Sequence, residues 1–282
     1  MITTQQPDAA AKSIVHRRDW VASGVAVAVA ALAAIILTAA IQARILDLRV
    51  VLDYLVSPEI LTASVNVFVL GTLALVVALG VGLLVALMRI SRTVLMRRIA
   101  GVYIYLFRGT PMLIQLLFWF NAVPTMFRHV HIAVPFTHWV LLDAATTSVI
   151  TPLVAGVCGL GFAEAAYMAE IIRGGIEAVD KGQRAAARAL GMTQLGLFRH
   201  VVGPQAARII VPTIGNQYIM LLKSASLAST IGYLELLRVS TDIYSSNFRV
   251  VELLVVCAFW YLVLTGIVTI VQAVLERRFP VR

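Results

Sequence analysis

The sequence predicts an all-α integral membrane protein with six transmembrane helices and no soluble domain of its own. Hydrophobic residues fill 60% of its 282 positions and charged residues 13%, against about 45–50% and about 25% in ordinary soluble domains. A helix needs about 20 mainly apolar residues to cross a bilayer. Three uncharged runs reach this length, with 24 residues at 20–43, 29 at 60–88 and 23 at 253–275.

Three further spans are interrupted by charge, and we place them at about 99–121, about 146–172 and about 206–229. They contain, in order, Arg108, Glu164 with Glu170, and Lys223. A charge inside a membrane span is costly and usually faces a partner or a water-filled cavity. These spans are therefore where we expect polar contacts.

The first apolar run predicts a retained helix, although Arg17 and Arg18 precede it as they would a secretion signal. The run is longer than the 7–15-residue core of a signal peptide, and no small-residue cleavage site follows it. We therefore expect a cytoplasmic tail over residues 1–19, and an extra N-terminal transmembrane helix with its outer linker over 20–56.

The basic residues predict the orientation of the chain. With the N-terminus in the cytoplasm, the cytoplasmic segments hold 16 Lys and Arg residues and the outer segments hold five. Basic residues concentrate on the cytoplasmic side of membrane proteins, so we expect both termini there and the chain in the cytoplasmic membrane. The net charge of +9 then needs no nucleic acid as a partner, because the basic residues face anionic lipids.

No residue pattern predicts a catalytic, cofactor or metal site. Cys158 and Cys257 fall inside spans, where they serve as small packing residues. His129, His131 and His138 share the predicted outer loop, where no carboxylate–histidine pattern completes a metal site. The sequence has no Gly-x-x-x-x-Gly-Lys-Ser/Thr phosphate loop. If ATP drives this protein, another subunit binds it.

A long polar, basic segment between two spans predicts a docking surface. Asp180 can accept a hydrogen bond from the first amides of a short helix, with Gln183 three residues on as in a capping box. Gly191 permits the left-handed backbone that ends a helix. Thr193 can then cap a second short helix that runs toward Pro204. Two short helices that meet at a glycine form a rigid turn on which another protein can dock.

This segment resembles the cytoplasmic coupling loop of the permease subunits of ABC importers, in the polar amino acid uptake family. The family's pattern is Glu-Ala-Ala, three residues, Gly, nine residues, Ile, one residue, Leu-Pro. The matching positions here are Ala185, Ala186, Ala187, Gly191, Val201, Gly203 and Pro204. Two alanines, the glycine and the proline fit, whereas Ala185 replaces the glutamate, Val201 the isoleucine and Gly203 the leucine.

Other stretches resemble the same family in the same order. They are SRTVLMRRIAGVYIYLFRGTPMLIQLLFWF (91–120), AAYMAEIIRGGI (165–176) and GNQYIMLLKSASLAS (215–229). The resemblance covers about 61–279 and begins only after the first span. It implies a type I ABC importer-like core of five helices, over 57–279, to which the N-terminal helix is added. Its coupling loop would lie at about 177–204.

The resemblance also implies a function and partners. The chain would be the permease subunit of an ATP-driven importer that moves polar amino acids into the cell by alternating access. Its partners would be a cytoplasmic ABC ATPase that binds the ATP, a second permease subunit, an outer substrate-binding protein and membrane lipid. The residues that would contact the ATPase are Asp180, Gln183, Arg184, Ala185, Ala186, Ala187, Arg188, Gly191 and Pro204.

Glu164 is the sharpest candidate for a substrate contact. Tyr167 and Met168 follow it at helical spacing, so the three are expected to share a face. Glu164 would meet a substrate ammonium group in the translocation path, which favours cationic amino acids. The equally weighted alternative is a structural ion pair with Lys223 or Arg108, since a buried ion needs a partner in either case.

Two other groups of polar residues have candidate roles. Lys223 and Ser226, with Ser224, Ser229 and Thr230 around them, predict a cavity lining or a broken helix rather than a lipid-facing surface. The motif at the predicted inner end of the third span is assigned a structural role, with a gate as the alternative; it consists of Arg108, Gly109, Thr110 and Pro111.

Two other classes of membrane protein are alternatives to the importer. A secondary transporter driven by ion gradients predicts paired repeats in the two halves of the chain, and the sequence has none. An accessory membrane subunit without a transport path predicts spans without interior charges, unlike those found here.

Overall fold

The computed structural model describes residues 46–133, 135 and 140–278, together with 23–25, 27–29, 31, 35, 38 and 42. The chain divides into two units, Met1–Asp53 and Tyr54–Arg282. The predicted tail at 1–19 lies outside the described residues, and so does most of the predicted N-terminal span at 20–43. The short helix α2 (Leu48–Leu55) ends the linker that follows.

The first helix of the second unit is α3 (Pro58–Ile90), which contains the longest uncharged run. Ser57 caps it, and its hydroxyl accepts a hydrogen bond from the Ile60 N–H. α3 packs along α8 (Pro152–Glu177). The contact is close because Gly82 has no side chain: a Cβ there would lie 2.6 Å from Cβ of Met168.

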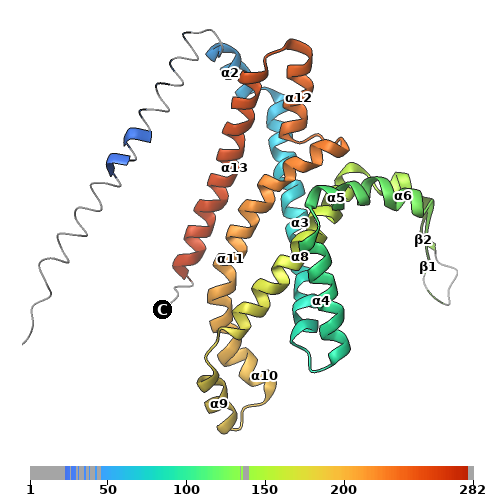
Figure 1. Ribbon diagram of the computed structural model, residues 1–282, viewed down its shortest axis with the longest axis vertical. Coiled ribbons are helices and arrows are strands. Elements are labelled where there is room, and N and C mark those ends of the chain that lie inside the picture. The colour runs from blue at the N-terminus through green and yellow to red at the C-terminus, as the bar shows by residue number, and fades with distance from the viewer. Residues whose placement is uncertain are drawn as a thin grey trace, which may run out of the picture. The chain divides into compact units, whose positions relative to one another are not determined.

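The predicted third span is wrong as a single straight helix. α4 (Val94–Gly109) ends where α5 (Met112–Leu117) begins at an angle, and the run to Met126 is bent by 103°. The π-helical turn η1 (Phe118–Ala122) and α6 (Val123–Met126) complete it. Figure 1 shows this sharp change of direction between α4 and α5. The motif that contains Arg108 therefore lies in the middle of the predicted span and not at its end.

The bend has a physical cause in the sequence. Proline disfavours a helical backbone in the residue before it, and Thr110 is accordingly extended, with φ −109° and ψ 140°. Gln115 stabilises the exposed carbonyl groups. Its Nε2 donates to the carbonyl oxygens of Phe107, at 2.9 Å, and of Thr110, at 3.1 Å.

A two-stranded antiparallel hairpin follows α6, which the all-α prediction did not include. β1 (His129–Ala133) pairs with β2 (Val140–Ala145), and His131 lies opposite Asp143. Nδ1 of His129 lies 3.1 Å from Oδ1 of Asp143, and Nδ1 of His131 lies 3.6 Å from Oδ2. The carboxylate that the outer-loop histidines lack in the local sequence thus comes from the opposite strand. His138 lies outside the described residues.

The fourth span starts later than predicted. α7 (Thr146–Val149) is a separate turn, and α8 begins at Pro152 with a hydrogen bond from the Val154 N–H to the Thr151 hydroxyl. Proline suits this first helical position because the N–H it lacks has no partner there. α8 is the central helix of the unit, since it packs against α3, α4, α5 and α11.

The rest of the chain forms the segment between α8 and α11, followed by α11 itself and three further helical elements. α9 (Lys181–Ala189), α10 (Gln194–Leu197) and the π-helical turn η2 (Phe198–Val202) lead into α11 (Gly203–Ser224). The 3₁₀ segment η3 (Ala225–Ile231) continues it, and α12 (Leu236–Asn247) and α13 (Val250–Arg278) follow. Figure 1 shows α9 and α10 at one end of this unit and α12 at the other.

Within the described residues, three helices are long and apolar enough to cross a membrane: α3, α8 and α13. The bent pair of α4 with the run from Met112 to Met126 makes a fourth if it counts as one span. α11 is more polar, because it carries Arg208 and Lys223 as well as several amides.

Candidate functional site

Two side-chain caps hold the polar segment between α8 and α11, as the sequence predicts. The Gln183 N–H donates to Oδ1 of Asp180 at 3.0 Å, which starts α9. The Gly196 N–H donates to the Thr193 hydroxyl at 3.1 Å, which starts α10. The Gln183 side chain does not complete a capping box. Its Oε1 instead accepts a hydrogen bond from Nε2 of Gln205 on α11, at 2.5 Å.

The turn between α9 and α10 depends on Gly191, whose φ is +75°. Two hydrogen bonds close it: the Met192 N–H donates to the Ala187 carbonyl at 3.2 Å, and the Gly191 N–H donates to the Arg188 carbonyl at 2.9 Å. This pair of bonds is the Schellman motif, in which a left-handed residue ends a helix. The predicted left-handed glycine is confirmed.

The segment has a small hydrophobic core of its own and is tied to α8. The core consists of Val179, Ala187, Leu197, Val202 and Ala206. Nη2 of Arg184 donates to the carbonyl oxygen of Ile176 at the end of α8. α8 is braced there as well, because Arg173 forms ion pairs with Glu170 at 2.7 Å and with Glu177 at 2.5 Å. α9 is therefore joined to the end of α8 by a side-chain contact as well as by the chain itself.

The outer surface of this segment is apolar to a degree that the sequence analysis did not identify. Ala185, Ala186 and Arg188 are exposed, as a contact surface requires. Leu190 is 84% exposed and Leu195 is 75% exposed, and Phe198 is exposed as well. A leucine beside the glycine that ends a helix is a signal that could have found this surface, because that position points away from the helix it follows.

Glu164 is buried in the middle of α8, with 1% of its surface exposed. The side chain of Gln217 on α11 forms a hydrogen bond with its carboxylate. Oε1 is also buried and has no hydrogen-bond partner among the described residues. Over the same part of the chain, no ion pair joins Glu164 to Arg108 or Lys223. A buried carboxylate oxygen without a partner has capacity for a further donor.

The neighbours of Glu164 on α8 face different partners. Met168 is fully buried against α3 at Gly82. Tyr167 is half-buried, and the Arg108 guanidinium lies over its ring, with Cζ 5.0 Å from the ring centroid. Arg108 at the bend is thereby held against α8 by a cation–π contact. The three residues of the predicted shared face thus do not point to a single place.

Lys223 and Ser226 lie where α11 changes into η3. Lys223 is exposed in the last turn of α11, and the Ser226 hydroxyl donates to its carbonyl oxygen at 2.8 Å. The hydroxyls of Ser229 and Thr230 likewise bond to carbonyl groups one turn earlier in η3. These hydroxyl groups supply hydrogen bonds to backbone carbonyl groups where the α-helix tightens into a 3₁₀ helix, which agrees with the predicted broken helix.

The described residues contain no cluster of three His, Cys, Asp or Glu side chains that could hold a metal ion. The candidate site is therefore built from two parts: the buried carboxylate of Glu164 between α8 and α11, and the capped segment that joins the same two helices at one end. Both parts involve the same pair of helices, α8 and α11.

Comparison with known proteins identifies the family. The model of the binding-protein-dependent transport system inner membrane component matches residues 60–280. The arginine transport system permease protein ArgU of Corynebacterium glutamicum is 36% identical over 98% of this chain and 85% of its own length. The glutamine transport system permease protein GlnP of Escherichia coli K12 is 32% identical over 75% of this chain and 89% of its own.

Solved structures agree with these relatives. The crystal structure of an amino acid ABC transporter with histidines is 33% identical and superposes with a TM-score of 0.70, over 83% of this chain and 99% of that one. The MetNI methionine ABC transporter, at 18% identity and a TM-score of 0.57, shares the fold over 82% of this chain and 98% of its own. The chain belongs to the binding-protein-dependent inner membrane components, and within them to the polar amino acid ABC transporter permeases.

Proposed function

We propose that this permease imports amino acids by alternating access, with Glu164 as the contact for the substrate ammonium group. The observation that carries the proposal is the buried Oε1 of Glu164, which has no hydrogen-bond partner among the described residues. An ammonium group donates three hydrogen bonds and carries the complementary charge. A carboxylate held by Gln217 on the neighbouring helix can receive it without first breaking an ion pair.

A preference for cationic substrates deepens this proposal. The arginine and glutamine permeases among the relatives act on amino acids that differ in side-chain charge. A second ammonium or a guanidinium gains a Coulomb attraction from a buried negative charge that a neutral amide does not, and this attraction is strong where water is excluded. Arginine and lysine are therefore the substrates that Glu164 should favour.

The family implies that the ATPase and the substrate-binding protein are separate subunits. We propose that the ATPase docks on the exposed surface of α9 and α10, on the cytoplasmic side. The transporter would also contain a second permease subunit, either another copy of this chain or a similar one. The 16-to-5 distribution of basic residues supports this orientation, with both termini in the cytoplasm. ATP-driven movement of α9 would then reach Glu164 through α8. An ATP-driven importer therefore agrees with the family better than an ion-gradient transporter or an accessory subunit does.

The test replaces Glu164 by glutamine, which keeps the size of the side chain and removes its charge. In vesicles that contain the complete transporter, Glu164→Gln should reduce uptake of labelled arginine or lysine at least tenfold, equivalent to about 1.4 kcal/mol, and reduce glutamine uptake less. Assembly and basal ATP hydrolysis should persist.

Glu59→Gln is the matched control, because Glu59 is exposed in the first turn of α3. It should leave uptake of all three amino acids unchanged. An equal, small effect of Glu164→Gln on every substrate, or failure of that variant to assemble, would favour a structural role and exclude Glu164 from the substrate path.

A further inference from the structure

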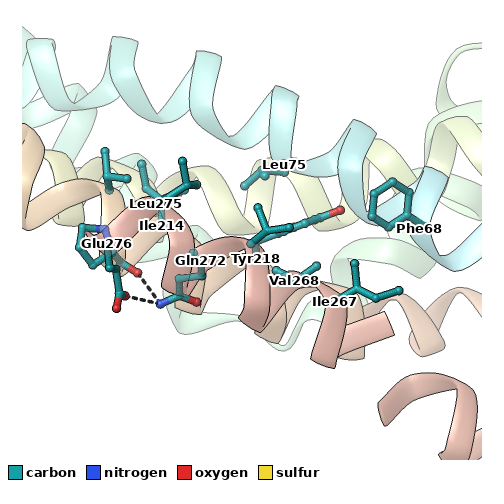
Figure 2. A pocket seen from close by; sticks show the side chains of 13 residues that line it. Phe68, Leu75, Ile214, Tyr218, Ile267, Val268, Gln272, Leu275 and Glu276 are labelled. Atoms are coloured by element: carbon teal, nitrogen blue, oxygen red, sulfur yellow. Dashed lines mark hydrogen bonds between the residues drawn. The ribbon is translucent and has the colours of Figure 1, made fainter. Parts of the chain in front are cut away.

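A groove unrelated to Glu164 runs between three helices. It lies among α3, α11 and α13 and has a volume of about 320 Å³, which is within the range of ligand pockets. Figure 2 shows Phe68 and Ile267 toward one end and Leu275 and Glu276 at the other, with Tyr218 between them. Its walls are almost entirely hydrocarbon, and it opens on the surface beside Ile267, which is 51% exposed.

Polar groups occur only at intervals along this groove, and most of them are already engaged. The hydroxyl groups of Tyr218 and Thr72 share a hydrogen bond of 2.6 Å. Toward the other end, Nε2 of Gln272 donates to Oε1 of Glu276, at 2.8 Å, and to Oδ1 of Asn216, at 3.0 Å. The helices α11 and α13 approach closely here, because a Cβ on Gly215 would lie 2.7 Å from Cδ of Gln272.

One acceptor at the polar end has no partner. Oε1 of Gln272 is buried and unbonded among the described residues, beside the carboxylate of Glu276. Arg208 is exposed and does not itself line the groove, but it lies one helical turn before Pro212, which does. Oε1 of Gln272 faces Gly215 and is closed off from the groove. The mouth therefore offers the carboxylate of Glu276 and, one turn of α11 away, a guanidinium.

We propose that this groove binds one membrane phospholipid whose headgroup carries hydrogen-bond donors, as phosphatidylethanolamine does. An acyl chain fills the apolar length from Leu275 to Phe68. The ammonium group donates to the carboxylate of Glu276, and the phosphate pairs with Arg208. The polar mouth lies at the last turn of α13, which ends in Arg277 and Arg278. Basic residues at the end of a span are typical of the place where it meets the polar surface of a bilayer.

The charge pattern selects this occupant over others. A segment of protein packed in the groove would bring apolar side chains against the carboxylate of Glu276, whose one hydrogen bond from Gln272 does not compensate for the loss of water around the charge. A phosphatidylcholine headgroup has a phosphate but no N–H. The mouth accepts donors and also offers a cation, so a zwitterionic headgroup with N–H groups satisfies both.

The lipid would stabilise the packing of α11, the helix that carries Gln217, against α13. Its acyl chain bridges α11 and α13 at Gly215, two residues before Gln217, the partner of Glu164. Occupancy would hold α11 in place against α13. The site itself depends only on the embedding of the chain in a bilayer and stands whether or not Glu164 contacts substrate.

The first test fills the groove. The full-length chain is purified in its assembled transporter with an equal mixture of phosphatidylethanolamine and phosphatidylcholine of identical acyl chains, and bound lipid is counted by native mass spectrometry. Ile267→Trp places a large ring in the groove and should lower bound phosphatidylethanolamine about tenfold. Ile270→Trp is the matched control, because Ile270 is 67% exposed on the same helix and does not line the groove. Equal loss in both variants, or no loss in either, would overturn the proposal.

The second test addresses the headgroup. The parent protein should retain phosphatidylethanolamine over phosphatidylcholine, and Glu276→Leu should abolish that preference while keeping total lipid. Arg208→Gln should weaken both phospholipids and leave diacylglycerol, which has no phosphate, unaffected. Equal retention of the two phospholipids by the parent would exclude the headgroup assignment. Cross-linking of a photoreactive residue at Ile267 to protein rather than to lipid would show that a polypeptide occupies the groove.

Discussion

Arg184 on α9 donates a hydrogen bond from Nη2 to the carbonyl oxygen of Ile176, in the last turn of α8. Its Nε is buried and has no partner among the described residues, so this single bond orients the guanidinium. The contact joins the surface proposed to meet the ATPase directly to the helix that carries Glu164.

Removal of this contact should uncouple the two activities of the transporter. Arg184→Gln cannot reach the Ile176 carbonyl, and the loss of a hydrogen bond from a charged group costs about 1.5–3 kcal/mol. We expect ATP hydrolysis to persist while the number of molecules imported per ATP falls severalfold. Arg199→Gln, at an exposed position of η2, should retain the parent ratio. An unchanged ratio in Arg184→Gln would contradict the transmission of force through this bond.

Gly191 should tolerate only residues that adopt a left-handed backbone. Its φ of +75° is unfavourable for a β-branched residue, at a cost of about 1–3 kcal/mol. Gly191→Val should impair uptake and retain membrane insertion, whereas Gly191→Asn should remain active because asparagine enters this region more readily. The comparison is made by uptake assays at matched expression. Normal transport by Gly191→Val would show that the turn does not need its observed shape.

Two alanines of α9, Ala185 and Ala187, should respond differently to replacement by glutamate. Ala187 is buried in the core of the segment, whereas Ala185 is exposed. Ala187→Glu should destabilise the segment by about 1–3 kcal/mol, as overpacking typically does, and should increase amide hydrogen exchange throughout α9. Ala185→Glu restores the residue type found in the family pattern and should be tolerated in both structure and uptake. Similar exchange rates in the two variants would rule out the core described here.

Glu235 should stabilise the fold in a pH-dependent manner. It is fully buried at the start of α12, where its carboxylate accepts hydrogen bonds from the N–H groups of Leu237 and Arg238 and from the Tyr261 hydroxyl. Burial raises the pKa of Glu235, although these bonds oppose the shift. The folded state then binds the proton more tightly than the unfolded state, so this contribution to the free energy of unfolding decreases as the pH rises from the ordinary glutamate pKa to the raised one.

Glu235→Gln tests that dependence. The amide puts a donor where the backbone N–H groups need an acceptor, at a cost of about 1–3 kcal/mol, and it should remove this part of the pH dependence. Thermal unfolding of the purified transporter across that pH range measures both effects. Unlike Glu164→Gln, this variant should lose stability rather than substrate preference. An identical pH dependence in the parent and in Glu235→Gln would contradict the assignment.

Features set by neighbouring residues could be predicted from the sequence. The caps at Asp180 and Thr193, and the left-handed Gly191, each depend on a backbone contact within five residues. The apolar runs within α3 and α13 also follow from composition alone. The bend at Pro111 was not predicted, although proline and glycine are its local cause, because the choice between a helix start and a break depends on how Gln115 supplies the freed carbonyl groups with a donor.

Contacts between distant segments could not be predicted. The Gln183 side chain has a plausible local partner at the start of α9, yet it bonds to Gln205. Glu164 has basic candidates in two neighbouring spans, yet Gln217 is its partner. In each case the local chemistry permits several partners, and the packing of α8 against α11 selects among them. The hairpin at 129–145 is a similar case, since Asp143 meets the histidines only after the strands pair.

The buried core formed by Val179, Ala187, Leu197, Val202 and Ala206 has a thermodynamic consequence for assembly. A loop that became ordered only on contact with its partner would lose about 1–2 kcal/mol of backbone entropy for each residue fixed. With its shape set in advance, this segment avoids that cost each time a partner subunit binds. In the proposed mechanism, the free energy released by nucleotide binding would then remain for displacing helices against the surrounding lipid.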